Sequence, residues 1–151
     1  MSTRVVYLDT SAVVKWYVLE SGSDVVKALY LSAWNGGVKL SFSLWNISEI
    51  LGVLSKYYQR GLLGSNEYKA ARGMFLSETI RMLKLGLLKI VPLKLDIITE
   101  SWRIIEKYDI YEADAIQITS AKYIKASEFY IADKRLCNIA VKEGVKVVCI
   151  E

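Results

Sequence analysis

The chain has 151 residues, enough for one domain with its own hydrophobic core, and we expect a single domain over residues 1–151. A net charge of +4 permits nucleic-acid binding, and a mean hydropathy of +0.25 favours a homodimer or a protein partner. The chain contains no histidine, which excludes imidazole acid–base chemistry, catalytic triads and His-ligated zinc. Any catalysis must then depend on carboxylates, hydroxyls, lysines or a metal ion.

Two further features of the composition concern the compartment and the cysteines. No uncharged apolar run approaches the roughly 18 residues that span a bilayer, and no signal-peptide pattern opens the chain, so we expect a cytoplasmic protein without membrane contact. Cys137 and Cys149 lack CxxC spacing and histidine partners. We interpret both as buried, apolar thiols.

The N-terminal half begins with the apolar run of residues 5–8, which predicts a strand buried on both faces. Helices are expected over residues 12–18 and 23–34, and a short strand over 39–42. Two long helices follow at 44–60 and 65–84, separated by Gly61 and Gly64, and we expect them to form a hairpin. The apolar stripe of the first is predicted to contain Leu44, Ile47, Leu51, Leu54 and Tyr58, and that of the second Tyr68, Ala71, Phe75 and Met82.

The C-terminal half continues the alternation of strands and helices. A strand at residues 88–91 ends at Pro92, which favours the end or edge of a sheet because proline cannot donate a hydrogen bond. Helices are predicted at 97–108, 112–125 and 134–143, and strands at 128–132 and 145–150. This order predicts an α/β domain with a mainly parallel sheet.

Asp9 and Asp133 each directly follow an apolar strand. In a parallel sheet both carboxylates should emerge at the same edge, where ligands bind in open α/β folds. Each could equally be a helix N-cap, because aspartate is favoured there.

Two other acids are ambiguous by local pattern. Asp114 lies in the first turn of its helix, at the border of the apolar stripe, where exposure to solvent is the simpler interpretation. Glu49 lies opposite the expected apolar stripe, so periodicity predicts a solvated charge.

Four segments around these acids resemble, in order and spacing, the PIN-domain nucleases. They are Val-Tyr-Leu-Asp-Thr-Ser-Ala at 6–12, Ile-Ser-Glu-Ile at 47–50, Ala-Asp-Ala-Ile at 113–116 and Ala-Asp-Lys-Arg-Leu at 132–136. The chain is most similar to the toxins of VapBC-type toxin–antitoxin pairs. This resemblance implies a three-layer PIN-like fold, with helices on both faces of the sheet and a protruding long-helix hairpin.

The resemblance also implies a function and a site. Asp9 and Asp114 would be primary ligands of Mg²⁺ or Mn²⁺, and Glu49 and Asp133 would complete a four-acid site that cleaves single-stranded RNA with a metal-activated water. Further expected contacts to metal-bound water, substrate or phosphate are Ser11, Lys15, Lys134 and Arg135. The expected partners are single-stranded or structured RNA, a small antitoxin and a second copy of the chain.

Other functions remain open at this level. A PIN domain can act in RNA processing, or as a non-catalytic module that binds RNA or protein. A haloacid-dehalogenase-type phosphohydrolase would need a second acid two residues after Asp9, where the chain has Ser11. A phospho-receiver domain would place paired acids before its phosphoacceptor strand, whereas here Asp9 comes first.

Overall fold

The computed structural model describes residues 3–150, and its centre is one sheet of five parallel strands. In chain order these are β1 (Val5–Leu8), β2 (Lys39–Ser43), β3 (Leu88–Val91), β4 (Glu128–Ile131) and β5 (Val147–Cys149). Their spatial order is β3-β2-β1-β4-β5, so β1 is central, with Val6 opposite Leu40 on one side and Glu128 on the other. The predicted parallel sheet and the edge position of the strand before Pro92 are both confirmed.

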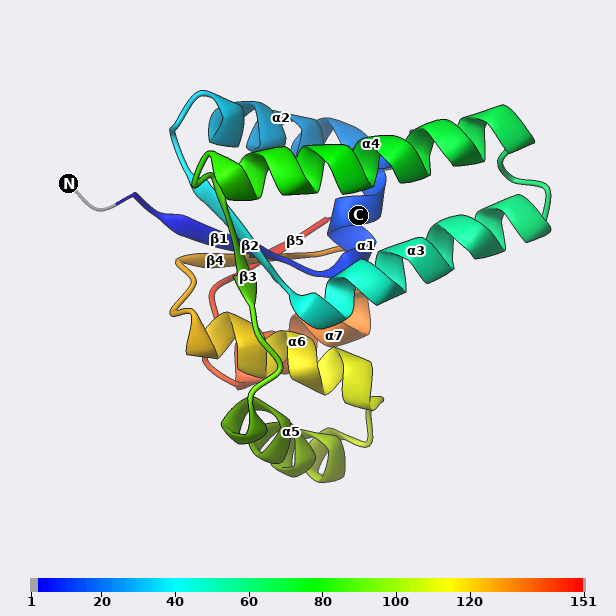
Figure 1. Ribbon diagram of the computed structural model, residues 1–151. Helices are drawn as coiled ribbons and strands as arrows, with labels where there is room; N and C mark the ends of the chain where they lie inside the picture. The colour runs from blue at the N-terminus through cyan, green and yellow to red at the C-terminus, as the bar shows by residue number, and fades with distance from the viewer. Residues whose placement is uncertain (1–2, 151) are drawn as a thin grey trace.

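Helices cover both faces of this sheet (Figure 1). One layer contains α1 (Thr10–Tyr17), α2 (Ser23–Trp34) and α4 (Ser65–Lys84); the other contains α5 (Leu95–Tyr108), α6 (Glu112–Tyr123) and α7 (Lys134–Lys142). Helix α3 (Leu44–Gln59) runs alongside α4, and the far ends of both project beyond the sheet as the predicted hairpin. These layers give the three-layer α/β architecture that the PIN-domain resemblance implied.

The buried surface of the hairpin agrees only in part with the predicted stripes. On α4, Ala71, Phe75 and Met82 are buried as expected. On α3, Leu44 and Tyr58 are instead exposed, and the buried residues are Asn46, Ile50 and Leu54. The reason is tertiary: the start of α3 packs against the end of the sheet while its far end projects into the hairpin, so no single apolar stripe faces the core along its whole length.

Cys137 is buried as predicted, but the prediction of two free thiols was wrong. Cys137 in α7 and Cys149 in β5 form a disulfide, and Cys149 is exposed. The two residues are 12 positions apart and meet because α7 packs beside β5, a contact with no local signature in the sequence. Among the described residues, no helix combines the length and apolar character that crossing a membrane requires.

Candidate active site

Asp9 and Asp133 lie at the carboxyl ends of the neighbouring strands β1 and β4. The Asp9 N–H donates to the carbonyl of Tyr130 at 3.0 Å, which ties the two strand ends together. The prediction that both carboxylates emerge at one sheet edge is confirmed. Both also cap helices, because Asp9 accepts from the N–H of Ser11 and Asp133 from the N–H of Leu136, each at 3.2 Å. The capping and site interpretations are therefore compatible.

A cavity of about 450 Å³ opens at this edge, and three aspartates from different elements line it. Asp9 and Asp133 come from the strand ends, and Asp114 comes from the first turn of α6. Asp114 is half-buried, so the solvent-exposed interpretation of its helix position was wrong. The remaining wall contains Thr10, Ser11, Val14, Lys15, Glu20, Val53, Tyr57 and Ala132.

Glu49 joins these acids from α3. It is partly buried, and its Oε1 accepts hydrogen bonds from the hydroxyl of Thr10 at 2.9 Å and from Nε2 of Gln117 at 3.5 Å. The solvated charge predicted from periodicity was therefore wrong. Two elements distant in the chain, α1 and α6, therefore hold this carboxylate of α3 at the sheet edge.

A buried polar network lies beneath the acids, and the sequence reasoning missed it. The hydroxyl of Tyr7 donates to Oε1 of Gln117 at 2.8 Å and lies 3.3 Å from Oδ1 of Asn46. Asn46 in turn donates to the Thr10 hydroxyl at 3.1 Å. Tyr7, Asn46 and Gln117 are fully buried, so their polar groups depend on one another for hydrogen bonds. One signal was available: Asn46 precedes Glu49 by three residues and Gln117 follows Asp114 by three, a spacing that places each pair on one helix face.

The surroundings of Asp9, Glu49 and Asp114 raise the pKa of each carboxyl group. Burial raises the pKa of Glu49 to about 7, with repulsion from Asp9 and Asp114 adding to the rise and the Thr10 hydrogen bond opposing it. Burial likewise raises the pKa of Asp114 to about 6, where Asp9 and Asp133 add and Arg135 opposes. The pKa of Asp9 is raised mainly by burial, against the hydrogen bonds from Ser11. Burial and mutual repulsion together disfavour ionisation of these carboxyl groups.

The donor set fits a hard divalent cation. Within residues 3–150, no three or more His, Cys, Asp and Glu side chains are arranged closely enough to form a metal-binding group. Mg²⁺ nevertheless commonly binds through one or two carboxylates and completes its octahedron with water. Asp9 and Asp114 would supply such a pair, since both line one cavity and the charge of Asp9 raises the pKa of Asp114.

The expected substrate contacts have different surroundings. The Ser11 hydroxyl donates to Asp9 at 2.5 Å and accepts from the N–H of Ala132 at 3.0 Å, so it bridges the two strand ends. Lys15 is largely buried and donates to Glu20 and to the carbonyl of Ser21. Lys134 is exposed at the start of α7. Contacts of these side chains with RNA remain predictions.

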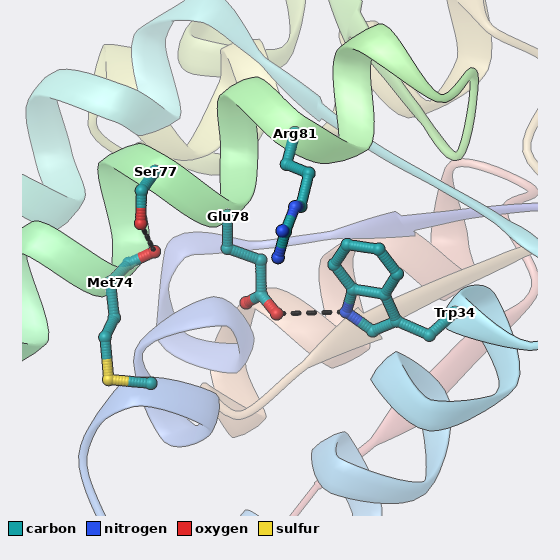
Figure 2. Close-up of a pocket in the computed structure, with 5 residues that line it drawn as sticks. All are labelled: Trp34, Met74, Ser77, Glu78 and Arg81. Carbon is teal, nitrogen blue, oxygen red and sulfur yellow. Dashed lines mark hydrogen bonds between the residues drawn. The ribbon is translucent and has the colours of Figure 1, made fainter.

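Another cavity lies away from the acids, between α2 and α4, with a volume of about 520 Å³ (Figure 2). Glu78 at its wall accepts hydrogen bonds from the indoles of Trp16 and Trp34 and from the hydroxyl of Tyr17, at 2.6 to 3.0 Å. Figure 2 shows Arg81 on the same helix above the Trp34 indole. Glu78 thus links α1, α2 and α4, and none of the predicted site acids lies here.

The sequence matches the PIN domain family over residues 6–142, and the chain belongs to that family. The match confirms the resemblance to PIN domains that the four short segments indicated, and it supports a nuclease function.

The fold is similar to that of several solved structures. VapBC2 from Rickettsia felis, bound to a DNA fragment from its promoter, matches with a TM-score of 0.66 and 14% identity over 97% of this chain and 99% of that chain. VapC20 from Mycobacterium tuberculosis, described as a Sarcin-Ricin loop cleaving toxin, matches with a TM-score of 0.61 and 14% identity over 87% and 92%. PAE2754 from Pyrobaculum aerophilum matches with a TM-score of 0.60 and 17% identity over 98% and 91%. No curated protein matches the chain in sequence.

Proposed function

We propose that this PIN domain, spanning residues 1–151, is a Mg²⁺- or Mn²⁺-dependent endoribonuclease that cleaves single-stranded RNA. The observation that carries the proposal is the convergence of Asp9, Asp114 and Asp133, from three separate elements, on one cavity at the carboxyl edge of the sheet. Arg135 offsets part of the repulsion, but Asp9 and Asp133 still raise the pKa of Asp114. An acid cluster of this kind is stabilised by a bound cation.

In this proposal Asp9 and Asp114 hold the cation, and Glu49 and Asp133 complete the site. When bound, the cation would lower the pKa of a water molecule and neutralise charge on the scissile phosphate. Ser11 fixes the rotamer of Asp9 through its short hydrogen bond. Thr10 and Gln117 fix Glu49 in the same way. These supporting contacts hold the carboxylates in place, which reduces the reorganisation needed for the reaction.

We further propose that the protein is the toxin of a toxin–antitoxin pair and acts in the cytoplasm. Structural neighbours described as VapBC2 and as a Sarcin-Ricin loop cleaving toxin support this role, and the latter suggests that structured RNA is also a substrate. A small antitoxin would be its protein partner. Exposed Leu62, Met74 and Ile80 on the α3–α4 hairpin supply apolar surface for the expected homodimer. Size-exclusion chromatography with light scattering, alone and after coexpression with a small protein encoded beside it, tests both associations.

The nuclease proposal is tested by cleavage of a mixed RNA pool with Mg²⁺, with Mn²⁺ and with a chelator, for the wild type and for Asp9→Asn. We expect metal-dependent cleavage by the wild type and at least a 100-fold loss in Asp9→Asn, on the order of what removal of a key electrostatic group costs. Asp24→Asn, an exposed aspartate of α2, is the matched control and should cleave like the wild type.

Two outcomes contradict the proposal. Cleavage that persists in the chelator excludes the metal mechanism, and full activity of Asp9→Asn excludes the assigned site. RNA binding without cleavage under every metal condition would instead support the non-catalytic alternative.

A further inference from the structure

A second cavity adjoins the acid cavity, and its walls differ in chemistry. It has a volume of about 380 Å³ and is lined by Asp109, Ile110, Tyr111, Asp114 and Arg135. Asp114 lines both cavities, so the second begins where the acid cavity ends. Its volume lies in the range of roughly 300–1,000 Å³ typical of small-ligand sites. A polymer bound at the acids can therefore extend into it.

Tyr111 presents a free aromatic ring at this cavity. Its side chain is 83% exposed, and within residues 3–150 no hydrogen bond, ring contact or cation engages it. Tyr123, at the other end of α6, is instead 40% exposed, and its hydroxyl and ring both contact Lys94. Ring exposure of this degree beside a catalytic acid leaves a flat surface on which a nucleobase can stack.

Arg135 supplies a fixed positive charge on the same wall. Its Nη2 donates to the carbonyls of Tyr108 at 3.3 Å and Asp109 at 3.0 Å, which hold the guanidinium against the loop before α6. Because both bonds use one nitrogen, the other guanidinium N–H groups remain available to a phosphate. The wall thus combines an anchored cation with an aromatic surface, the two features shared by sites for single-stranded nucleic acids.

We infer that this cavity is a nucleotide subsite, in which the base of a residue flanking the scissile bond stacks on Tyr111 while Arg135 contacts its phosphate. The inference depends on the proposed nuclease function and makes Tyr111 a substrate-positioning residue of the same site. Stacking on an aromatic ring tolerates every base, because each base has a π face. The subsite therefore requires an unpaired nucleotide but does not select its identity.

The test compares the wild type with Tyr111→Ala and Tyr111→Phe on one RNA oligonucleotide whose cleavage site has been mapped. Loss of one base–aromatic stack should lower kcat/KM by about 5- to 100-fold in Tyr111→Ala, mainly through KM. Tyr111→Phe should stay within about twofold, because phenylalanine keeps the ring. Tyr123→Ala is the matched control and should cleave like the wild type. Thermal unfolding should be unchanged in Tyr111→Ala, because the ring is exposed.

An abasic scan identifies the stacked nucleotide. Substrates lacking one base at each of the three positions on either side of the cut are cleaved by the wild type and by Tyr111→Ala. At one position, we expect removal of the base to slow the wild type as much as the substitution does, with no further effect in Tyr111→Ala. If Tyr111→Ala matches the wild type, or if every abasic effect persists in it, the subsite is refuted.

A binding readout separates this inference from the proposed nuclease function. In the Asp9→Asn background, adding Tyr111→Ala should weaken binding of the uncleaved RNA by at least fivefold. Normal metal-dependent cleavage with an unchanged affinity refutes the subsite alone. Absence of cleavage by the wild type refutes the nuclease function, and unchanged affinity in that case refutes both.

Discussion

Raising the pH of the metal-free protein from about 5 to about 7 is expected to lower its free energy of unfolding. In the folded protein, burial raises the pKa of Glu49 to about 7 and that of Asp114 to about 6, from ordinary values of 4.5 and 3.8. At pH values between the ordinary and the raised pKa of each group, the folded state binds more protons than the unfolded state. Stability is therefore fully present at low pH and is lost as the pH rises through the folded pKa values.

The magnitude follows from the two shifts. At 1.36 kcal/mol per pKa unit, each shift would correspond to about 3 kcal/mol for a fully buried group. Both carboxylates are only partly buried, and part of each shift is their shared repulsion with Asp9, so the two values do not add. We expect a combined loss of about 2 kcal/mol, equivalent to a decrease in Tm of about 4–8 °C for a domain of this size.

The assay is urea unfolding, followed by circular dichroism, across this pH range in chelator and in Mg²⁺. Because the chain has no histidine, few other groups titrate between pH 5 and 7. The measured pH dependence therefore reports mainly on the carboxyl groups of the site. Glu49→Gln should flatten the dependence, whereas Glu106→Gln, an exposed glutamate of α5, should not. Mg²⁺ should restore stability near pH 7. A stability that is constant or rises from pH 5 to 7 in chelator would refute the electrostatic reasoning.

Three further predictions concern stability. Reducing the Cys137–Cys149 disulfide, or substituting Cys149→Ser, should lower the free energy of unfolding by about 3 kcal/mol, measured by urea unfolding with and without reductant; no change would show that the cross-link contributes nothing. Hydrogen bonds, the strongest of them from Arg103, lower the pKa of Glu143 to about 2. The contribution of ionised Glu143 to stability is therefore present above about pH 4.5 and is lost as the pH falls towards 2. Glu143→Gln should therefore lower the free energy of unfolding by about 1–2 kcal/mol at neutral pH; this value allows for solvent screening, because the Arg103 side chain is half-exposed. The substitution should also make stability less sensitive to acid, and an unchanged midpoint of acid unfolding would contradict this. Glu78→Leu should cost about 3 kcal/mol in thermal unfolding, because it leaves two indoles and a phenol without their acceptor, and should leave RNA cleavage unchanged below the melting range.

The elements of this chain could be predicted from local pattern because each has a strong local cause. The apolar runs before Asp9 and Asp133 contain enough β-branched and aromatic residues to specify strands, and parallel pairing then places both carboxylates at one edge. Gly61 and Gly64 separate the two long helices of the hairpin. The first helix began two residues earlier than expected, at Thr10, because Asp9 itself serves as its cap.

The composition of the site depended more on tertiary contacts. Glu49 lies on a helix face that periodicity predicts to be solvated. It joins the site because Thr10 and Gln117, from other elements, donate hydrogen bonds to its carboxylate. Asp114 faces the cavity because α6 packs beneath the sheet, which its position in the first turn does not specify.

The sequence by itself determined the parallel α/β order, the two strand-end aspartates and, through the PIN resemblance, the four acids to examine. Only the tertiary structure decided that Glu49 and Asp114 are partly buried, that Cys137 and Cys149 are cross-linked, and that Tyr111 shares a cavity wall with Asp114. The physical reason is range: strand and helix patterns arise from neighbours within a few residues, whereas burial, charge coupling and disulfide pairing depend on which distant segments pack together.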